Sequence, residues 1–116
     1  MKQRKDRSRR SRRGEASVDP FGSRALMVCR EARDALALAL AEARDPGLAE
    51  ARLLDVIPDP DLSRLRARVA APAEACIAVR EALARSHRYL RAAAMAELDR
   101  KHTPDLAFTV VPEEDA

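Results

Sequence analysis

Residues 81–108, EALARSHRYLRAAAMAELDRKHTPDLAF, contain the signals that decide the fold of this chain. Ser86 is expected to cap a new helix, because its hydroxyl can accept a hydrogen bond from an amide of the first helical turn. Pro104 cannot continue a helix and favours an extended conformation at Thr103. The stretch therefore predicts two helical segments that meet near residues 86–88, a stop at Thr103-Pro104 and a strand over residues 106–110. The buried face of the two helices is marked by apolar residues at helical spacing, namely Val79, Leu83, Leu90, Ala94 and Leu98.

The first half of the chain predicts one long helix followed by a β-hairpin. The helix is expected to begin at the cap Ser23, to run to about Ala43 and to end at Asp45-Pro46-Gly47, because proline and glycine both break helices. Residues 52–57 and 62–70 are expected to be the two strands, with Pro58-Asp59-Pro60-Asp61 as the turn between them. A second helix is expected to open at Pro72.

The second predicted strand alternates between apolar and basic residues. Leu65, Ala67 and Val69 point to one face of the sheet, and Arg64, Arg66 and Arg68 point to the other. The three arginines can be the solvated face of a half-covered sheet, paired with local acids such as Asp55. They can also be a stripe that contacts phosphates.

Read in order, the elements are helix, strand, strand, helix, helix, strand, which is an α+β order with helices on one face of a small three-stranded sheet. One domain is expected, because 116 residues are too few for two.

Several short motifs in this order resemble the ribosome-binding factor A family. They are Tyr89-Leu90-Arg91, Thr103-Pro104-Asp105-Leu106-Ala107-Phe108, the turn Asp45-Pro46-Gly47-Leu48 and the strand start Asp61-Leu62. The resemblance implies a single type II KH-like domain over residues 23–112, with the order α-β-β-α-α-β. The family interrupts its helix with an Ala-x-Gly kink, whereas this chain has Ser86-His87-Arg88 at that place and lacks the glycine. It also has Val111 where the family tends to have an aspartate.

The net charge is distributed unevenly along the chain. Residues 1–13 hold eight Lys/Arg and one Asp, a charge of +7, whereas the rest of the chain holds 14 basic and 18 acidic residues, a charge of −4. Residues 1–22 have too little apolar content to form a core, so we expect a disordered basic arm. Such an arm can neutralise RNA phosphates, or it can be a solvated tail that only aids solubility. Residues 113–116 are expected to form a short acidic tail.

The sequence offers no catalytic constellation. His87 and His102 have no HExxH spacing, and Cys29 and Cys76 form no CxxC motif and fall on predicted apolar faces, where buried structural thiols are expected. We therefore expect no enzyme activity and no cofactor. No apolar run is long enough to span a membrane and the N-terminus has no apolar signal region, so a cytoplasmic protein is expected. It is also expected to be a monomer.

The resemblance implies a factor that binds small-subunit rRNA on the free small ribosomal subunit and assists its late maturation. Phosphate contacts are expected from the junction of the two helices, from the end of the second helix and from the basic arm. The residues are Arg85, Ser86, His87, Arg88, Arg91, Arg100, Lys101, Arg9, Arg10, Arg12 and Arg13. Two alternatives stay open. One is a protein-interaction module that has lost RNA binding, as the missing glycine, the acidic domain and Val111 suggest. The other is a non-specific nucleic-acid binder that acts through the arm alone.

Overall fold

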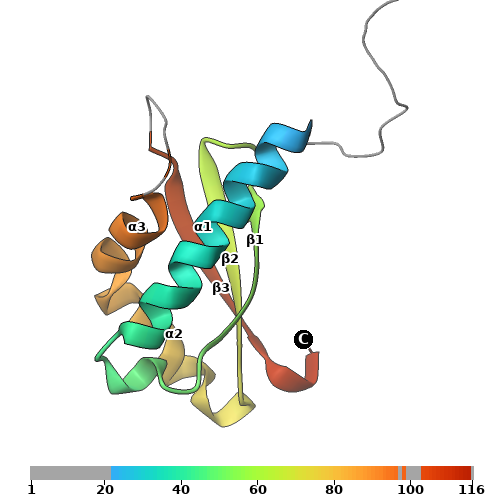
Figure 1. Ribbon diagram of the computed structural model, residues 1–116. Helices are drawn as coiled ribbons and strands as arrows, with labels where there is room; N and C mark the ends of the chain where they lie inside the picture. The colour runs from blue at the N-terminus through green and yellow to red at the C-terminus, as the bar shows by residue number, and fades with distance from the viewer. Residues whose placement is uncertain (1–21, 97, 99–102, 116) are drawn as a thin grey trace, which may run out of the picture.

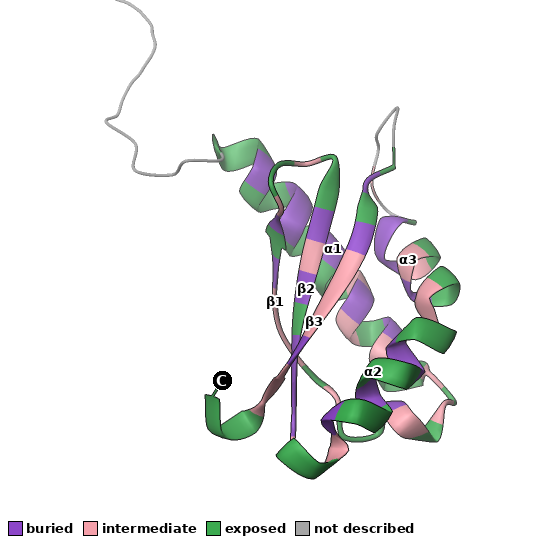
Figure 2. Cartoon of the chain, turned by 180° about the vertical axis from the view of Figure 1, so that it is seen from behind, coloured by how far each residue is buried: buried purple, intermediate pink, exposed green. Residues whose placement is uncertain are grey.

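Three α-helices cover one face of a three-stranded sheet, as two opposite views show (Figures 1 and 2). The computed structural model describes residues 22–96, 98 and 103–115. Along the chain follow α1 (Gly22–Glu42), β1 (Arg52–Pro58), β2 (Arg64–Ala71), α2 (Cys76–Arg85), α3 (His87–Met95) and β3 (Asp105–Pro112). Short 3₁₀ turns lie at Pro46–Leu48, Ala73–Ala75 and Glu113–Asp115. The predicted α+β class and the order α-β-β-α-α-β are confirmed.

The sheet has the order β1-β2-β3 and is mixed. β1 and β2 form the predicted antiparallel hairpin, whereas β3 pairs in parallel with the other edge of β2. A parallel pair needs a crossover connection, and here α2 and α3 form that crossover on the covered face of the sheet. β2 is therefore the central strand, and β3 is an edge strand beside α2 and α3.

The core lies between the sheet and the helices and is built from small and medium aliphatic side chains. The alternation in β2 is confirmed, because Leu65, Ala67 and Val69 are fully buried. The predicted helical stripe is confirmed for Val79, Leu83, Leu90 and Ala94, which are buried, whereas Leu98 packs against the cluster from beyond the end of α3.

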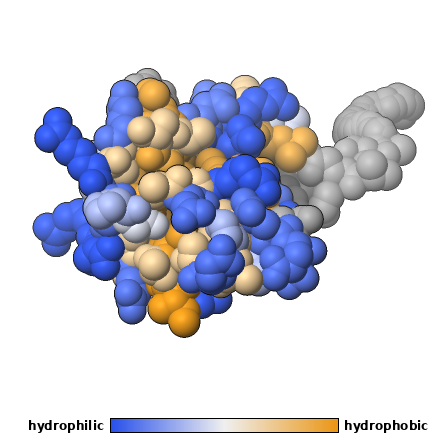
Figure 3. All heavy atoms as spheres, turned by 90° about the horizontal axis from the view of Figure 1, so that it is seen from below, coloured by the Kyte–Doolittle hydropathy of each residue, from blue (hydrophilic) through white to orange (hydrophobic). Residues whose placement is uncertain are grey.

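Several large hydrophobic side chains are exposed on the surface. Seen from below, hydrophilic side chains project around the rim of the molecule, and hydrophobic ones lie between them (Figure 3). The apolar side chains that are most exposed lie on the helices, and they include Met27 and Leu38 on α1 and Ile77 on α2. No helix among the described residues is both long and apolar enough to cross a membrane.

Several predicted boundaries are wrong by a few residues. Ser23 is not a cap, because α1 already begins at Gly22. β2 begins at Arg64, because the Asp61 side chain accepts a hydrogen bond from the Ser63 amide at 2.8 Å and so extends the turn. Pro72 precedes a 3₁₀ turn, and α2 proper begins only at Cys76.

The last helix is shorter than predicted. α3 ends at Met95, well before the stop expected at Thr103-Pro104. The strand that follows is longer than predicted and runs from Asp105 to Pro112. The predicted acidic tail begins with the 3₁₀ turn Glu113–Asp115. The predicted disorder of the basic arm concerns residues that, apart from Gly22, lie outside the described part of the chain.

Candidate nucleic-acid interface

The junction between α2 and α3 is a break at a single residue. Ser86 lies between the two helices with φ −97° and ψ 5°, a conformation that residues other than glycine can adopt. Its amide donates to the Ala82 carbonyl at 2.9 Å, and its carbonyl accepts from the Leu90 amide at 2.9 Å. Backbone hydrogen bonding therefore continues across the break, and this chain forms two separate helices without the glycine. The predicted capping role of the Ser86 side chain is wrong, because its hydroxyl makes no capping hydrogen bond.

Arg85 ties the end of α2 to the turn that follows α1. Its Nε donates to Asp45 Oδ2 at 3.0 Å and its Nη2 donates to Asp45 Oδ1 at 2.9 Å, which is the two-point geometry that arginine and carboxylate favour. Asp45 also accepts a hydrogen bond from the Gly47 amide at 2.9 Å. Both donors hold the pKa of the Asp45 carboxyl below its usual range, with the Arg85 hydrogen bond as the larger cause. Arg85 thus links two distant parts of the fold.

The Asp45 contacts predict a pH-dependent contribution to stability. Because the pKa is lower in the folded state, the contribution is present above the unfolded-state value of about 3.9 and is lost as the pH falls through the folded-state value. Asp45→Asn should therefore unfold at lower urea concentration than wild type at neutral pH, and the difference should shrink in acid. Asp34→Asn is the control, because its carboxylate lies 3.9 Å from Arg33 in an exposed pair. A difference that stays constant from neutral to acidic pH would contradict the assignment.

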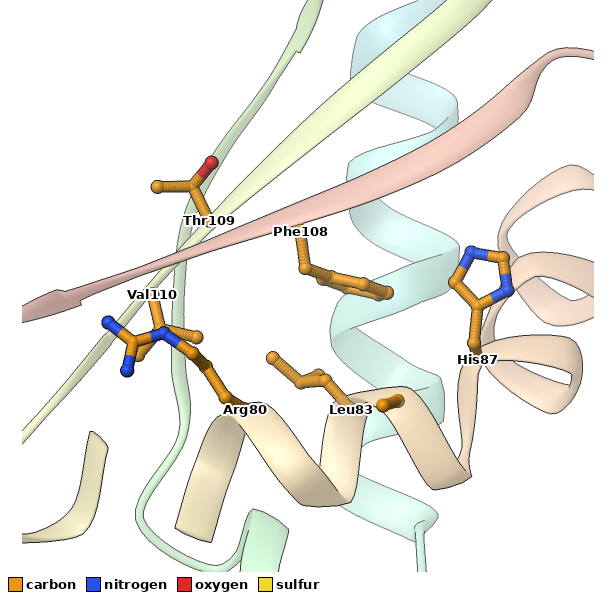
Figure 4. A pocket seen from close by; sticks show the side chains of 7 residues that line it. Arg80, Leu83, His87, Phe108, Thr109 and Val110 are labelled. Atoms are coloured by element: carbon orange, nitrogen blue, oxygen red, sulfur yellow. The ribbon is translucent and has the colours of Figure 1, made fainter. Parts of the chain in front are cut away.

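His87 is part of the packing between α3 and β3. Its Nε2 lies 2.7 Å from the Leu106 carbonyl oxygen, and since a carbonyl can only accept, the ring nitrogen donates. The ring also meets Phe108 edge-on, with centroids 6.1 Å apart at 84° (Figure 4). The sequence placed His87 among the expected phosphate contacts, and in the structure its ring is half-buried with Nε2 engaged by the Leu106 carbonyl. Its partners lie about twenty positions away in the chain, so nothing local to His87 indicates them.

Loss of the His87 hydrogen bond should destabilise the domain measurably. His87→Phe retains an aromatic ring but leaves the carbonyl of the buried Leu106 without this donor, which should cost about 1–2 kcal/mol. His87→Gln can still donate and should lose less. Urea unfolding followed by circular dichroism measures both variants. Equal stability of the two would show that the hydrogen bond contributes little.

Arg91 holds the chain where it enters β3. Its Nε donates to the Pro104 carbonyl at 3.2 Å and its Nη2 to the Thr103 carbonyl at 3.4 Å. The same Nη2 lies 3.7 Å from Asp105 Oδ1. Like Arg85, Arg91 makes hydrogen bonds within the domain. Replacing Arg91 would therefore disturb the fold as well as any contact with RNA.

Arg88 differs from Arg85 and Arg91, the other two arginines that were predicted to contact phosphates at the helix junction. It lies exposed on the first turn of α3, and it makes no side-chain hydrogen bond or ion pair with any residue that the structure describes. Its guanidinium is therefore available to a phosphate without breaking a contact to any described residue. The other predicted contact residues lie outside the described residues, namely Arg9, Arg10, Arg12, Arg13, Arg100 and Lys101.

A hollow of about 720 Å³ lies between α2 and the edge strand β3 (Figure 4). Arg80 stands at one end of it and His87 at the other, with Leu83 and Phe108 between them. Arg80 was not among the predicted contact residues. Arg80 lies on α2 and His87 on α3, and the parallel edge strand β3 brings them to one hollow, so no local sequence signal indicates Arg80.

The three arginines of β2 are engaged on the open face of the sheet. Arg68 contacts Asp55 through two hydrogen bonds, one of them 2.8 Å long, and this pairing lowers the pKa of Asp55. Arg66 pairs with Asp59 and donates to Thr109 Oγ1 at 2.9 Å. Arg64 donates to the Asp59 carbonyl at 3.0 Å. These contacts favour a solvated, paired face over a stripe of free phosphate ligands.

The described residues offer no metal site, because they contain no cluster of three or more His, Cys, Asp or Glu side chains that could hold an ion. Cys29 and Cys76 are both buried and unpaired, as predicted. Burial raises the pKa of the Cys29 thiol, which disfavours the reactive thiolate.

Comparison with known proteins supports one family. No protein-family profile and no curated protein sequence matches the chain. Among solved structures, the crystal structure of ribosome-binding factor A from Thermus thermophilus is similar, with a TM-score of 0.66 and 26% sequence identity. The match covers 79% of this chain and 98% of the Thermus protein, so it includes nearly the whole of that fold. The resemblance inferred from the sequence motifs is thereby confirmed, and this chain has the KH-like fold of ribosome-binding factor A.

Proposed function

We propose that this protein is a ribosome assembly factor that binds small-subunit rRNA on the free small ribosomal subunit and assists its late maturation in the cytoplasm. The observation that carries the proposal is the structural match to a ribosome-binding factor over nearly the full length of that protein. The protein acts by binding and positioning, as a monomer, and needs no cofactor.

The exposed arginines around the helix junction supply the phosphate contacts of the domain. Arg88 extends from α3 without an internal partner among the described residues, and Arg80 stands beside the hollow between α2 and β3. Arg85 and Arg91 act indirectly, because their guanidinium groups fix the turn and the strand that frame the junction. The shape of a folded rRNA surface provides the selectivity, because few aromatic side chains are present to stack on bases.

The basic arm adds attraction that does not depend on sequence. Its eight Lys/Arg side chains can displace counterions from RNA, so it strengthens binding most at low salt. Arg100 and Lys101 add positive charge between α3 and β3.

Co-sedimentation with ribosomal particles on sucrose gradients tests the proposal. Tagged protein should be enriched on free small subunits, with little on large subunits or assembled ribosomes. Equal distribution over all particles that disappears with added salt would instead indicate a non-specific binder acting through the arm. Absence from every fraction would favour a protein-interaction module.

Arg88→Glu tests the contact at the junction. Loss of one charge-assisted hydrogen bond should weaken binding to small subunits on the order of tenfold, with the urea midpoint unchanged. Arg30→Glu is the matched control, because Arg30 is also exposed and makes no ion pair within the described residues but lies on α1. Equal affinities of the two variants would contradict the assignment of Arg88.

Deletion of residues 1–13 measures how much the arm contributes to the affinity for small subunits. A truncated protein that still selects small subunits would locate recognition in the domain.

A further inference from the structure

A second hollow, of about 610 Å³, lies between α1 and α3, away from the hollow beside β3. We call it the acidic groove. Its charged lining residues are all acids, Glu31, Asp34 and Glu42, which lie on one face of α1 at helical spacing. Leu38 and Tyr89 provide its larger apolar side chains, and the rest of its lining is alanine. The groove therefore repels RNA and suits a cationic occupant.

The larger apolar side chains of the acidic groove are exposed. Leu38 is 60% exposed and Tyr89 is 49% exposed, so both present apolar surface to an occupant of the groove. Of the three acids, Asp34 has a neighbouring base, Arg33, and their charged atoms are 3.9 Å apart with both side chains exposed. Such a pair is weak and leaves the carboxylate available.

The chain itself contains a segment of matching chemistry. Residues 2–13 carry six arginines and two lysines with a single acid. An arginine guanidinium can pair with a carboxylate at two points and stack on an aromatic ring, so an arginine-rich segment fits three carboxylates around a half-exposed tyrosine. We propose that residues 2–13 dock in the acidic groove of their own molecule when no nucleic acid is bound.

The geometry of the chain permits this docking. The arm joins the domain at Gly22, where α1 begins, and residue 13 precedes that point by nine residues. At about 3.3 Å per extended residue, residue 13 can reach about 30 Å from Gly22. With a rise of about 1.5 Å per helical residue, Glu31 lies about 14 Å from Gly22 along the axis of α1, and Glu42 lies about 30 Å from Gly22. The arm can therefore run back along the helix and place its arginines over all three carboxylates.

Each contact between the arm and the acidic groove is weak, but the arm is covalently connected to the domain, and this connection makes docking favourable. Exposed ion pairs contribute little singly, but tethering raises the local concentration of the arm to the millimolar range. The docked state must therefore be sensitive to salt. If the proposed RNA-binding function holds, the groove competes with RNA for the arm, so that weak non-specific sites are disfavoured and only a surface rich in phosphates releases the arm.

Tyr89 is a built-in reporter of this docking. The chain has one tyrosine and no tryptophan, so its intrinsic fluorescence arises from Tyr89 alone. In the full-length protein without RNA, quenching by acrylamide, which is uncharged, should be weak at about 10 mM salt. It should rise about twofold at about 1 M salt, where the Debye length falls from about 30 Å to about 3 Å.

Three variants decide whether the arm and the groove cause the protection. Replacing the six arm arginines by glutamine leaves the domain unchanged and should give strong quenching at every salt concentration. Glu31→Lys/Asp34→Lys/Glu42→Lys should do the same. Glu50→Lys/Glu74→Lys/Glu81→Lys makes an equal charge change at exposed acids outside the groove and should retain the protection.

Two results would overturn the proposal: Tyr89 quenching that does not depend on salt in wild type, or quenching unaffected by the arm substitutions. Addition of a single-stranded RNA oligonucleotide should then raise quenching in wild type, and no response would refute the competition. Because docking is measured without RNA or ribosomes, its failure is separate from a failure of the co-sedimentation experiment.

Discussion

Leu90→Ala should lower the free energy of unfolding by about 2–5 kcal/mol, the range for a leucine removed from a well-packed core. Leu90 is fully buried at the start of α3, where this helix packs against α1. Its side chain lies in the core cluster, and the cavity left by alanine cannot collapse easily because α3 is tied at its start by His87 and at Arg91. Urea unfolding monitored by circular dichroism measures the loss.

A second leucine of the same chain provides the control for that experiment. Leu38→Ala removes the same atoms from a side chain that is 60% exposed on α1, so the change in stability should be within about 0.5 kcal/mol. If both variants lost stability equally, burial of Leu90 would not explain its effect. If neither lost stability, the packing of α3 on α1 would not hold the domain together.

Gly47→Ala should destabilise the domain by about 1–3 kcal/mol, because the new methyl group has no space. A Cβ at position 47 would lie 2.7 Å from the Cβ of Ala82 and 3.2 Å from Nη2 of Arg85. The turn Pro46–Leu48 therefore approaches α2 so closely that only glycine fits. Relief of the contact with Ala82 requires the turn and α2 to move apart, and the contact with Nη2 also displaces Arg85 from Asp45, so the junction is weakened. Thermal or urea unfolding measures the loss.

A compensating substitution makes this prediction specific. Ala82→Gly removes the methyl group that Gly47→Ala would meet, at a cost of about 1 kcal/mol for glycine in a helix. The double variant should be more stable than the sum of the two single losses predicts, because the closest clash, with the Ala82 methyl group, is gone. Strict additivity would show that the close approach of the turn to α2 is not the cause.

Together these residues show how the fold presents its candidate RNA surface. The helix junction is held from three sides, by Asp45 through Arg85, by the Leu106 carbonyl through His87, and by the start of β3 through Arg91. A junction held in this way needs no glycine, because its conformation is set by distant contacts. Basic side chains that look equivalent in the sequence consequently differ in availability, and Arg88 is the exposed one without an internal contact among the described residues.

Most of the architecture could be predicted because its signals are local. The period of apolar residues on α2 and α3, the alternation along β2 and the breakers at Asp45-Pro46-Gly47 and Pro104 depend only on near neighbours in the chain. Element boundaries were less accurate, since α3 ends at Met95 without any breaker there. The short motifs, which occur at the separation typical of ribosome-binding factor A, indicated the family. Hydrophobic periodicity alone does not identify a family.

The roles of the individual charges were decided only by the tertiary structure. The sequence determined that arginines and a histidine gather around residues 85–91, and that the neighbouring elements are helices and a strand. It did not determine that Arg85 meets a carboxylate 40 residues earlier, or that His87 donates to a carbonyl 19 residues later. Ion pairs and hydrogen bonds depend on which elements become neighbours in space, and the parallel pairing of β3 with β2 sets that arrangement. Whether a charged side chain pairs within the domain or remains available to a binding partner is therefore decided only when those distant elements have come together.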